Sequence, residues 1–177
     1  MKIQSVLICL AVLTGLCTLT ADSQEQQKAA TRVYKDPDFG FSFEPPKFDK
    51  LPPDATVGAF LRTAPAVDGF ASNINVTVTQ AKTTRDESIR DFLGNLRRSG
   101  FRLLSQKKVT VSEKDAAIFE YSGRMPGQGQ VLHWLTLVVP GSERIYVITC
   151  TSTDTQFKNY EKLFRDSLDS FRLPKAK

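Results

Sequence analysis

Histidine and cysteine are scarce in this sequence of 177 residues, which contains one histidine and three cysteines. No cysteine and histidine stand at the spacing of a zinc site, so the sequence predicts no structural zinc. The glycines fit neither of the fingerprints that bind the phosphates of nucleotides. We therefore expect a protein that is not an enzyme, with no catalytic, cofactor-binding or metal-binding residues and no cofactor.

A long hydrophobic run is also missing, because a transmembrane helix needs about 20 apolar residues. The apolar stretch over residues 6–19 is shorter, follows Lys2 and gives way to small and polar residues. This pattern predicts a cleavable signal peptide over residues 1–21 and an extracytoplasmic protein, periplasmic or secreted. An uncleaved anchor and lipidation of Cys17 are the alternatives, although Leu16 is not the small residue that normally precedes a lipidated cysteine.

Loss of the signal peptide would remove two of the three cysteines, so we expect no internal disulfide. Residues 22–31 are polar and predict a linker, and residues 32–174 predict one domain that is held by its hydrophobic core. The formal net charge of +5 is mild, and Lys and Arg are interleaved with Asp and Glu. Nucleic-acid binders concentrate positive charge on one face, so we expect no nucleic-acid partner.

The domain alternates between strand and helix patterns. In residues 73–81, Ile74, Val76 and Val78 share one face, as in a half-buried strand. Residues 130–139 and 144–151 are apolar on both faces, which is typical of central strands covered from both sides. The predicted strands span residues 39–43, 57–63, 73–81, 101–111, 116–124, 130–139 and 144–151.

Two amphipathic helices complete the predicted fold. The first, over residues 86–99, begins at the capping box Thr84–Glu87, and the second, over residues 154–170, is expected to be capped by Thr153 and Gln156. Consecutive strands with short loops form antiparallel hairpins, and each helix needs a sheet face to cover. The sequence therefore predicts an α+β fold in which an antiparallel sheet lies between helices, an α/β/α sandwich.

His133 and Cys150 are the first candidates for chemistry, and both lie in predicted strands. A catalytic role for His133 would need a nucleophile or a carboxylate nearby, and we interpret it instead as a strand histidine packed beside an aromatic ring. Cys150 is interpreted as a small buried hydrophobic residue, because an activated thiol needs exposure and nearby positive charge.

Three acidic residues near the start of the domain, Asp36, Asp38 and Glu44, supply fewer oxygens than the six or so that a calcium ion takes. We interpret Asp36 and Asp38 as turn residues. Asn75-Val76-Thr77 matches a glycosylation sequon, which would matter only in a eukaryotic host.

The densest positive run contains Arg97, Arg98, Arg102, Lys107 and Lys108. Cations at a helix C-terminus stabilise the helix dipole, which is one interpretation, and an acidic partner or an anionic lipid headgroup is the other. The loop-rich segments 51–72 and 125–129 are the candidate partner-binding surface, since loops on a rigid scaffold often carry binding.

Two segments resemble a known family. The opening YKDPDFGFSFEPPKF and the closing ERIYVITCTST and YEKLFRDSLDSFRL are similar to the ends of the PsbP-like domain, over roughly residues 32–173. The resemblance implies the Mog1/PsbP-like fold and an extracytoplasmic, non-enzymatic role, as in photosystem accessory proteins and the DcrB group of bacterial envelope proteins. The chain departs from the photosynthetic members at Phe48, where they often have Trp, and it lacks their long extension, so photosystem binding is not carried over.

Two functional hypotheses follow. The first is an exported accessory protein, expected to be a monomer, that binds an envelope protein or complex through its loops. The second is a periplasmic carrier of a lipid or small apolar ligand, held in a pocket between sheet and helix.

Overall fold

The structure, a computed structural model, describes residues 33–50, 59–127 and 129–174. The chain divides into two units, Met1–Ala30 and Thr31–Lys177, and every element described below belongs to the second. The predicted signal peptide and the predicted linker lie outside the described residues. Within the described residues, no helix has both the length and the hydropathy that a membrane crossing requires.

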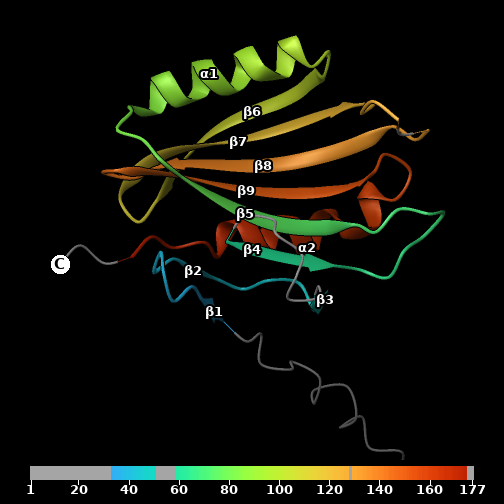
Figure 1. Cartoon of the computed structure of the whole chain (residues 1–177), viewed down its shortest axis with the longest axis horizontal. Helices are drawn as coiled ribbons and strands as arrows, with labels where there is room; N and C mark the ends of the chain where they lie inside the picture. Colours follow the sequence, from blue (N-terminus) through green and yellow to red (C-terminus); the bar gives the residue numbers. More distant parts are fainter. Residues whose placement is uncertain (1–32, 51–58, 128, 175–177) are drawn as a thin grey trace, which may run out of the picture. The chain divides into compact units, whose positions relative to one another are not determined.

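A seven-stranded antiparallel sheet forms the centre of this unit, and its strands lie in the order β3-β4-β5-β9-β8-β7-β6. A separate two-stranded ribbon is formed by β1 and β2 (Figure 1). The strands are β1 (Tyr34–Lys35), β2 (Ser42–Phe43), β3 (Asp49–Lys50), β4 (Phe60–Thr63), β5 (Asn73–Gln80), β6 (Arg102–Val111), β7 (Lys114–Gly123), β8 (Leu132–Pro140) and β9 (Arg144–Thr153).

Two helices, α1 (Arg85–Arg98) and α2 (Phe157–Asp169), cover opposite faces of the sheet. The alternation of β8 shows this: Leu135 and Leu137 pack in the cluster that includes α2, whereas Trp134 packs in the cluster that includes α1. All nine residues of β8 are buried, as expected for a strand with a helix on each side. The predicted α/β/α sandwich with an antiparallel sheet is therefore confirmed.

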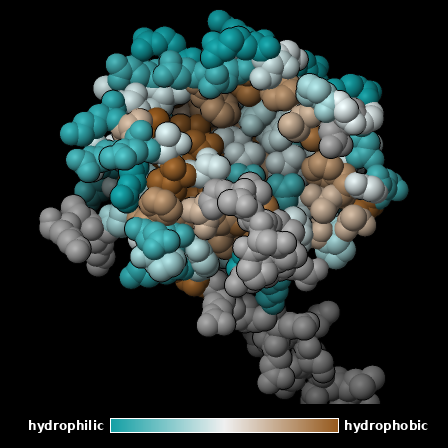
Figure 2. All heavy atoms as spheres, in the orientation of Figure 1, coloured by the Kyte–Doolittle hydropathy of each residue, from teal (hydrophilic) through white to brown (hydrophobic). Residues whose placement is uncertain are grey.

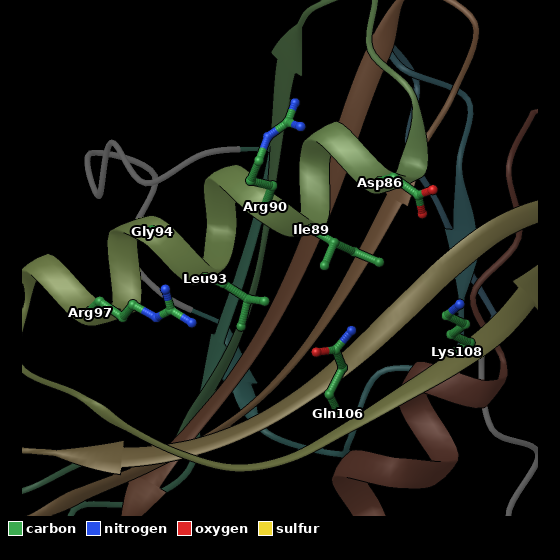
Figure 3. A pocket seen from close by; sticks show the side chains of 8 residues that line it. All are labelled: Asp86, Ile89, Arg90, Leu93, Gly94, Arg97, Gln106 and Lys108. Atoms are coloured by element: carbon green, nitrogen blue, oxygen red, sulfur yellow. The ribbon is translucent and has the colours of Figure 1, made fainter.

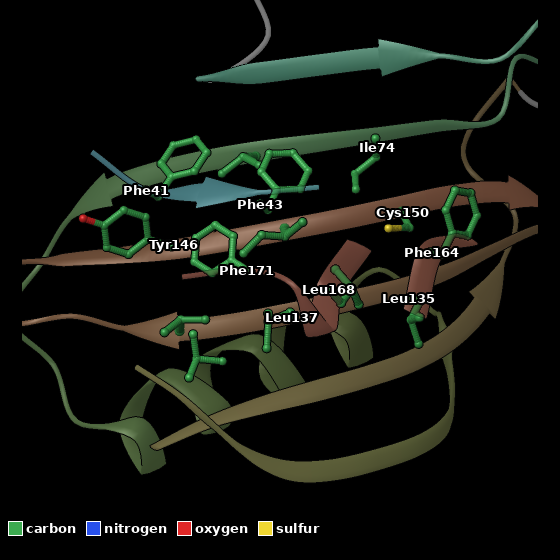
Figure 4. Close-up of a cluster of buried hydrophobic side chains, with 14 of the residues drawn as sticks. Phe41, Phe43, Ile74, Leu135, Leu137, Tyr146, Cys150, Phe164, Leu168 and Phe171 are labelled. Atoms are coloured by element: carbon green, nitrogen blue, oxygen red, sulfur yellow. The ribbon is translucent and has the colours of Figure 1, made fainter. Parts of the chain in front are cut away.

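The α2 side holds the larger core, in which aromatic and aliphatic side chains pack together. Phe164 and Leu168 of α2 and Phe171 after it point toward the sheet, where they meet Leu135 and Leu137 (Figure 4). All five side chains are at most 1% exposed. Burying one such side chain contributes about 1.5–3 kcal/mol, so a core of this size can hold the fold without a disulfide.

Helix α1 also sets the topology of the sheet. Strand β5 lies on one side of the central pair β9–β8, and β6 lies at the far edge beyond β7. Helix α1 connects β5 to β6 and contacts β6, β7 and β8 on its way. The chain therefore reaches the β6 edge by crossing over the sheet, and β6, β7, β8 and β9 then return as a meander.

The predicted capping box of α1 is confirmed in detail. The Thr84 side chain accepts a hydrogen bond from the Glu87 backbone N–H, and the Glu87 carboxylate accepts one from the Thr84 N–H. These two bonds satisfy free donors at the helix start. The bond from the Thr84 N–H, together with bonds that the Thr84 and Thr83 hydroxyls donate to the same carboxylate, holds the pKa of the Glu87 carboxyl below its usual range.

The predicted start of the second helix is wrong. Strand β9 continues to Thr153, which pairs with Leu132, and a turn follows before α2 begins at Phe157. Gln156 occupies the N-cap position but makes no side-chain capping bond. The pairing with β8 therefore determines where β9 ends, in preference to the local capping pattern.

The predicted strand over residues 39–43 is also shorter than expected. Gly40 has a φ of +71°, which turns the chain, so only Ser42 and Phe43 form β2. Phe41 and Phe43 are nevertheless buried in the α2-side core. The alternation identified the buried face, but the glycine limits the strand.

The hairpin between β6 and β7 turns on two residues, Ser112 and Glu113, which have φ values of +47° and +65°. Both therefore adopt the left-handed conformation of a type I′ turn, which costs a non-glycine residue about 1 kcal/mol. Ser112 contributes an interaction in return, because its hydroxyl accepts a hydrogen bond from the Leu173 N–H. Glu113 has no comparable bond among the contacts of the described residues.

Glu113→Gly is accordingly expected to stabilise the fold by about 0.5–1 kcal/mol, since glycine adopts a positive φ without strain. Urea denaturation would measure the change. Glu113→Ala is the matched control, because it removes the same side chain but keeps the strain. If both variants were equally stable, strain at this position would not limit stability.

Candidate partner-binding site

His133 is packed between the sheet and α2. It lies on β8 with 8% of its surface exposed, and its ring stacks on Phe157 with ring centroids 3.6 Å apart. The prediction of packing beside an aromatic ring is confirmed, although the partner is Phe157 of α2 and not the neighbouring Trp134.

Both ring nitrogens of His133 contact carboxylates. Nδ1 lies 3.0 Å from Asp154 and Nε2 lies 3.1 Å from Glu120. Glu120 also accepts a hydrogen bond from Arg165 of α2 at 3.0 Å. Each ring nitrogen already has a partner, so the imidazole has no free nitrogen with which to activate a nucleophile. The cluster connects β7, β8 and α2.

Cys150 is fully buried in the α2-side core, and its thiol is free. Burial raises the pKa of the Cys150 thiol well above its usual value, which suppresses the reactive thiolate. The interpretation of Cys150 as a buried hydrophobic residue is confirmed.

The acidic group at the start of the domain does not come together as a cation site. The Asp36 carboxylate is buried and accepts hydrogen bonds from the backbone N–H groups of Asp38 and Phe39 and from the Tyr34 hydroxyl. Burial, with this bond to Asp36, raises the pKa of Tyr34 to about 12. The predicted turn at Asp36 and Asp38 is confirmed, and within the described residues no three acidic, cysteine or histidine side chains form a metal-binding group.

The sequon at Asn75 lies in the middle of β5. Asn75 pairs in register with Thr149 of β9 and is partly buried. Glycosylated asparagines lie on surface loops, so this position is a poor acceptor.

A groove of about 440 Å³ lies between α1 and the edge strand β6. Ile89 and Leu93 of α1 point toward β6, and Gln106 of β6 points back toward the helix (Figure 3). Arg97 lies near one end of the groove and Lys108 near the other (Figure 3). The groove thus combines apolar walls with Arg97 at one end and with Lys108 and Asp86 at the other (Figure 3).

The basic run divides between two roles. Arg97 and Lys108 line the groove, whereas Arg98 donates a hydrogen bond to Asn95 within α1, and Arg102 and Lys107 are not lining residues. Arg97 and Arg98 occupy the last turn of α1, where cations favour the helix dipole.

Two further lining residues, Arg90 and Gly94, were not singled out from the sequence. Asp86, Arg90, Gly94 and Arg97 are three or four positions apart and therefore lie on one stripe of α1. Helical periodicity in the sequence could have shown that these four residues share a face. Asp86 is the only carboxylate among the lining residues, against the three cations Arg90, Arg97 and Lys108.

The predicted loop surface is partly described. Residues 51–58 lie outside the described residues, but the segment 64–72 and the segment 124–130 lie together, because the Gln130 side chain donates a hydrogen bond to the Asp68 carbonyl. The start of β6 lies at the same end of the sheet, since Arg102 pairs with Ser122 just before the second loop. We call the described residues of these three segments, 64–72, 102–104 and 124–130 without residue 128, the loop end.

Exposed apolar side chains gather at the loop end. Of the six large hydrophobic residues that are exposed within the described chain, four belong to it: Val67, Leu103, Leu104 and Met125. Figure 2 shows the sheet face on the α1 side as a hollow with brown and pale residues at its floor and teal residues above it. Exposed apolar groups rimmed by polar residues mark interaction surfaces in monomeric proteins.

Two other surface cavities are smaller than the groove. One of about 400 Å³ lies beside the β8–β9 turn and includes Gly141 and Tyr146, and one of about 290 Å³ lies between α2 and the Pro45–Pro46 segment. The second is lined by Leu163 and Phe48 but has no concentration of charge of one sign.

Solved structures with the same arrangement settle the fold. Cyanobacterial PsbP from Synechocystis sp. PCC 6803 superimposes with a TM-score of 0.56 over 80% of this chain and 91% of its own, at 13% identity. The chain has the Mog1/PsbP-like fold. This PsbP-like architecture confirms the family resemblance at the level of structure.

Two further PsbP-like matches come from other bacteria. LpqN, involved in cell envelope biogenesis of Mycobacterium tuberculosis, gives a TM-score of 0.60 over 81% of this chain and 90% of its own, at 13% identity. A protein of unknown function from Pseudomonas aeruginosa gives 0.60 over 82% and 98%, at 12% identity. No protein-family model and no curated protein matches the sequence.

The burial of Cys150 predicts its reactivity. In the native protein, iodoacetamide at mild alkaline pH is expected to leave Cys150 unmodified, because the thiol is inaccessible and protonated. Mass spectrometry of the tryptic peptide that spans residues 145–158 would report on this cysteine alone. The same treatment in concentrated urea is the control and should modify it fully. Modification without denaturant would show that the core opens or that Cys150 is exposed.

Proposed function

We propose that this chain is an exported, non-enzymatic accessory protein that binds another protein of the cell envelope through its loop end. The observation that carries the proposal is the exposure of Val67, Leu103, Leu104 and Met125 at one end of an otherwise well-packed domain. Water-exposed apolar side chains in such a group are stabilised when a partner covers them.

The chemistry of the site supports binding in preference to catalysis. The one histidine of the chain, His133, contacts Glu120 and Asp154 through its two ring nitrogens, and Cys150 is buried. Neither side chain is therefore available to a substrate. The loop end instead offers methionine, leucine and the exposed cation Arg124. Methionine and arginine are enriched at protein interfaces, where lysine and glutamate are depleted.

The compartment is part of the proposal. The predicted signal peptide over residues 1–21 would direct export, and LpqN, which shares the fold, is described as involved in cell envelope biogenesis. Both observations support an envelope partner. A partner in the photosystem is not proposed, because the likeness to cyanobacterial PsbP is one of fold at 13% identity.

The alternative, a carrier of an apolar ligand, finds less support. A carrier needs an apolar cavity that encloses most of its ligand. The three cavities described above lie at the surface and are open to solvent. The groove of about 440 Å³ has three cations among its lining residues. On the α2 side, the space between helix and sheet is filled by fully buried side chains such as Phe164 and Leu168.

The proposal predicts that an envelope protein is retained by the loop end. The tagged, exported chain would be cross-linked in its host, purified from the envelope fraction and compared with the double variant Leu103→Asp and Met125→Asp. We expect capture by the native protein and at least about a tenfold loss in the variant, because a buried charge in an interface costs more than about 1.4 kcal/mol.

Leu163→Asp is the matched control, because Leu163 is as exposed as Met125, 46% in each case, but lies on α2. It should leave capture unchanged. Equal capture by all three proteins would remove the loop end from the interface. Co-purification of lipid with no protein would replace the proposal with the carrier hypothesis.

A further inference from the structure

Among the described residues, strand β6 has an unpaired edge. It is the last strand of the sheet, it is ten residues long, and it pairs with β7 on one side only. Eight of its ten residues are exposed. Outward-facing N–H and C=O groups on such an edge can pair with an added strand.

The β6 edge has the features that keep proteins from pairing indiscriminately. Lys107 and Lys108 are adjacent, so their side chains point to opposite faces of the strand, and the register shifts between Leu103 and Ser105. Lysines and bulges on an edge oppose pairing with other strands. A strand that carries carboxylates would instead be attracted by Lys107 and Lys108. The lysines would therefore oppose pairing with basic or neutral strands but favour pairing with an acidic one.

The α1–β6 groove runs alongside this edge. Its helical lining residues extend from Asp86 to Arg97, which at 1.5 Å per residue corresponds to about 16 Å along α1. An extended chain rises about 3.3 Å per residue, so this length corresponds to about five residues of a strand. Three of five such residues would point toward the groove, because side chains alternate.

Gly94 is the least expected residue of the groove. It lies inside α1 and is not among the glycines with positive φ, so the backbone does not require it. A Cβ atom placed there would meet only the end of the Arg98 side chain, at 3.3 Å, so packing within the fold does not require it either. Glycine is among the least favourable residues in a helix interior. Gly94 is one of the residues that line the groove, together with Ile89 and Leu93.

From the edge, the groove and its charges together, we propose that an extended, acidic segment of a partner protein adds to the sheet along β6, with alternate side chains in the α1–β6 groove. Its apolar side chain contacts Ile89 and Leu93, and its acidic side chains two residues away on each side approach Arg97 and Lys108. This inference rests on the proposed function and names the type of segment and where it binds.

The position of the groove fits a partner that also covers the loop end. Leu103 and Leu104 begin β6, so the exposed apolar residues and the free edge belong to one continuous stretch of chain. Backbone hydrogen bonds along β6 would supply affinity, and the groove would supply side-chain selectivity, as in other cases of strand addition.

A synthetic peptide tests the site directly. The probe is an acetylated seven-residue peptide with a central leucine, an aspartate two residues away on each side and threonine elsewhere. Titrated into the exported chain, it should shift the amide NMR signals of β6 and α1 at up to millimolar concentration. Two further peptides carry N-methyl groups on alternate backbone nitrogens, one on the nitrogens that would face β6 and the other on those that would face away. The first should bind at least about tenfold more weakly than the unmethylated peptide, because it cannot donate backbone hydrogen bonds to β6.

Variants of the chain separate charge from shape. Arg97→Glu is expected to weaken peptide binding about tenfold, whereas Lys158→Glu, an equal change of charge at an exposed position of α2, should leave it unchanged. Gly94→Ala should raise the melting temperature by about 2–4 °C yet weaken binding about fivefold or more, because its methyl group occupies the groove.

Several outcomes would overturn the inference. These are amide shifts confined to other elements, equal effects of Arg97→Glu and Lys158→Glu, unchanged binding in Gly94→Ala, and binding of vesicles of anionic phospholipid with no binding of the peptide. In the cross-linking experiment, capture of a protein by the native chain and equally by Arg97→Glu would keep the proposed function and reject this site. A failure of the native chain to capture any protein would reject the proposed function itself.

Discussion

Burial of β8 on both faces is the constraint on which the rest of the structure depends, while one face of β9, with Ile145, Val147 and Thr149, is only partly buried. With no residue of β8 exposed, a helix must cover each side of the sheet. The chain has only two long helices among its described residues, so α2 closes one side after β9, and α1 must close the other while it carries the chain from β5 to β6. The requirement to bury β8 on both faces therefore explains the crossover.

The crossover in turn produces the candidate site. Because α1 delivers the chain to the far side of the sheet, β6 becomes an edge strand with a helix alongside it. The α1 residues Ile89 and Leu93 serve the α1-side core and, at the rim of that core, the wall of the groove. An apolar groove beside an unpaired edge is thus a geometric result of the fold, whereas the cations Arg97 and Lys108 at its ends belong to this sequence.

The local patterns allowed much of the fold to be predicted. The Thr84–Glu87 capping box and the apolar stripe of α1 depend on residues close in the chain, and both are present in the structure. The start of α2 could not be found in this way, because β9 continues to Thr153 through pairing with Leu132, a partner 21 positions away. Likewise, the shortened β2 depends on the positive φ of Gly40.

The candidate site was only partly accessible from the sequence, for the same reason. The basic run was visible as a cluster in the chain, but its division between Arg97 and Lys108 in the groove and the others elsewhere depends on how α1 lies against β6. The loop end depends on the hydrogen bond between Gln130 and Asp68, residues from two distant loops. Sequence patterns identified the segments, and long-range contacts decided which of their residues share a surface.

The comparison with other proteins of this fold clarifies what a partner would recognise. At 12–13% identity, this chain and its structural relatives keep the sandwich while most residues differ. A core accepts such change when hydrophobic pattern and volume are kept, whereas an exposed charge such as Lys108 has no packing role that would preserve it. Under the proposed function, recognition would depend on surface residues that the fold does not require. Gly94 fits that description best, since it costs helix stability and neither the backbone nor the packing explains it.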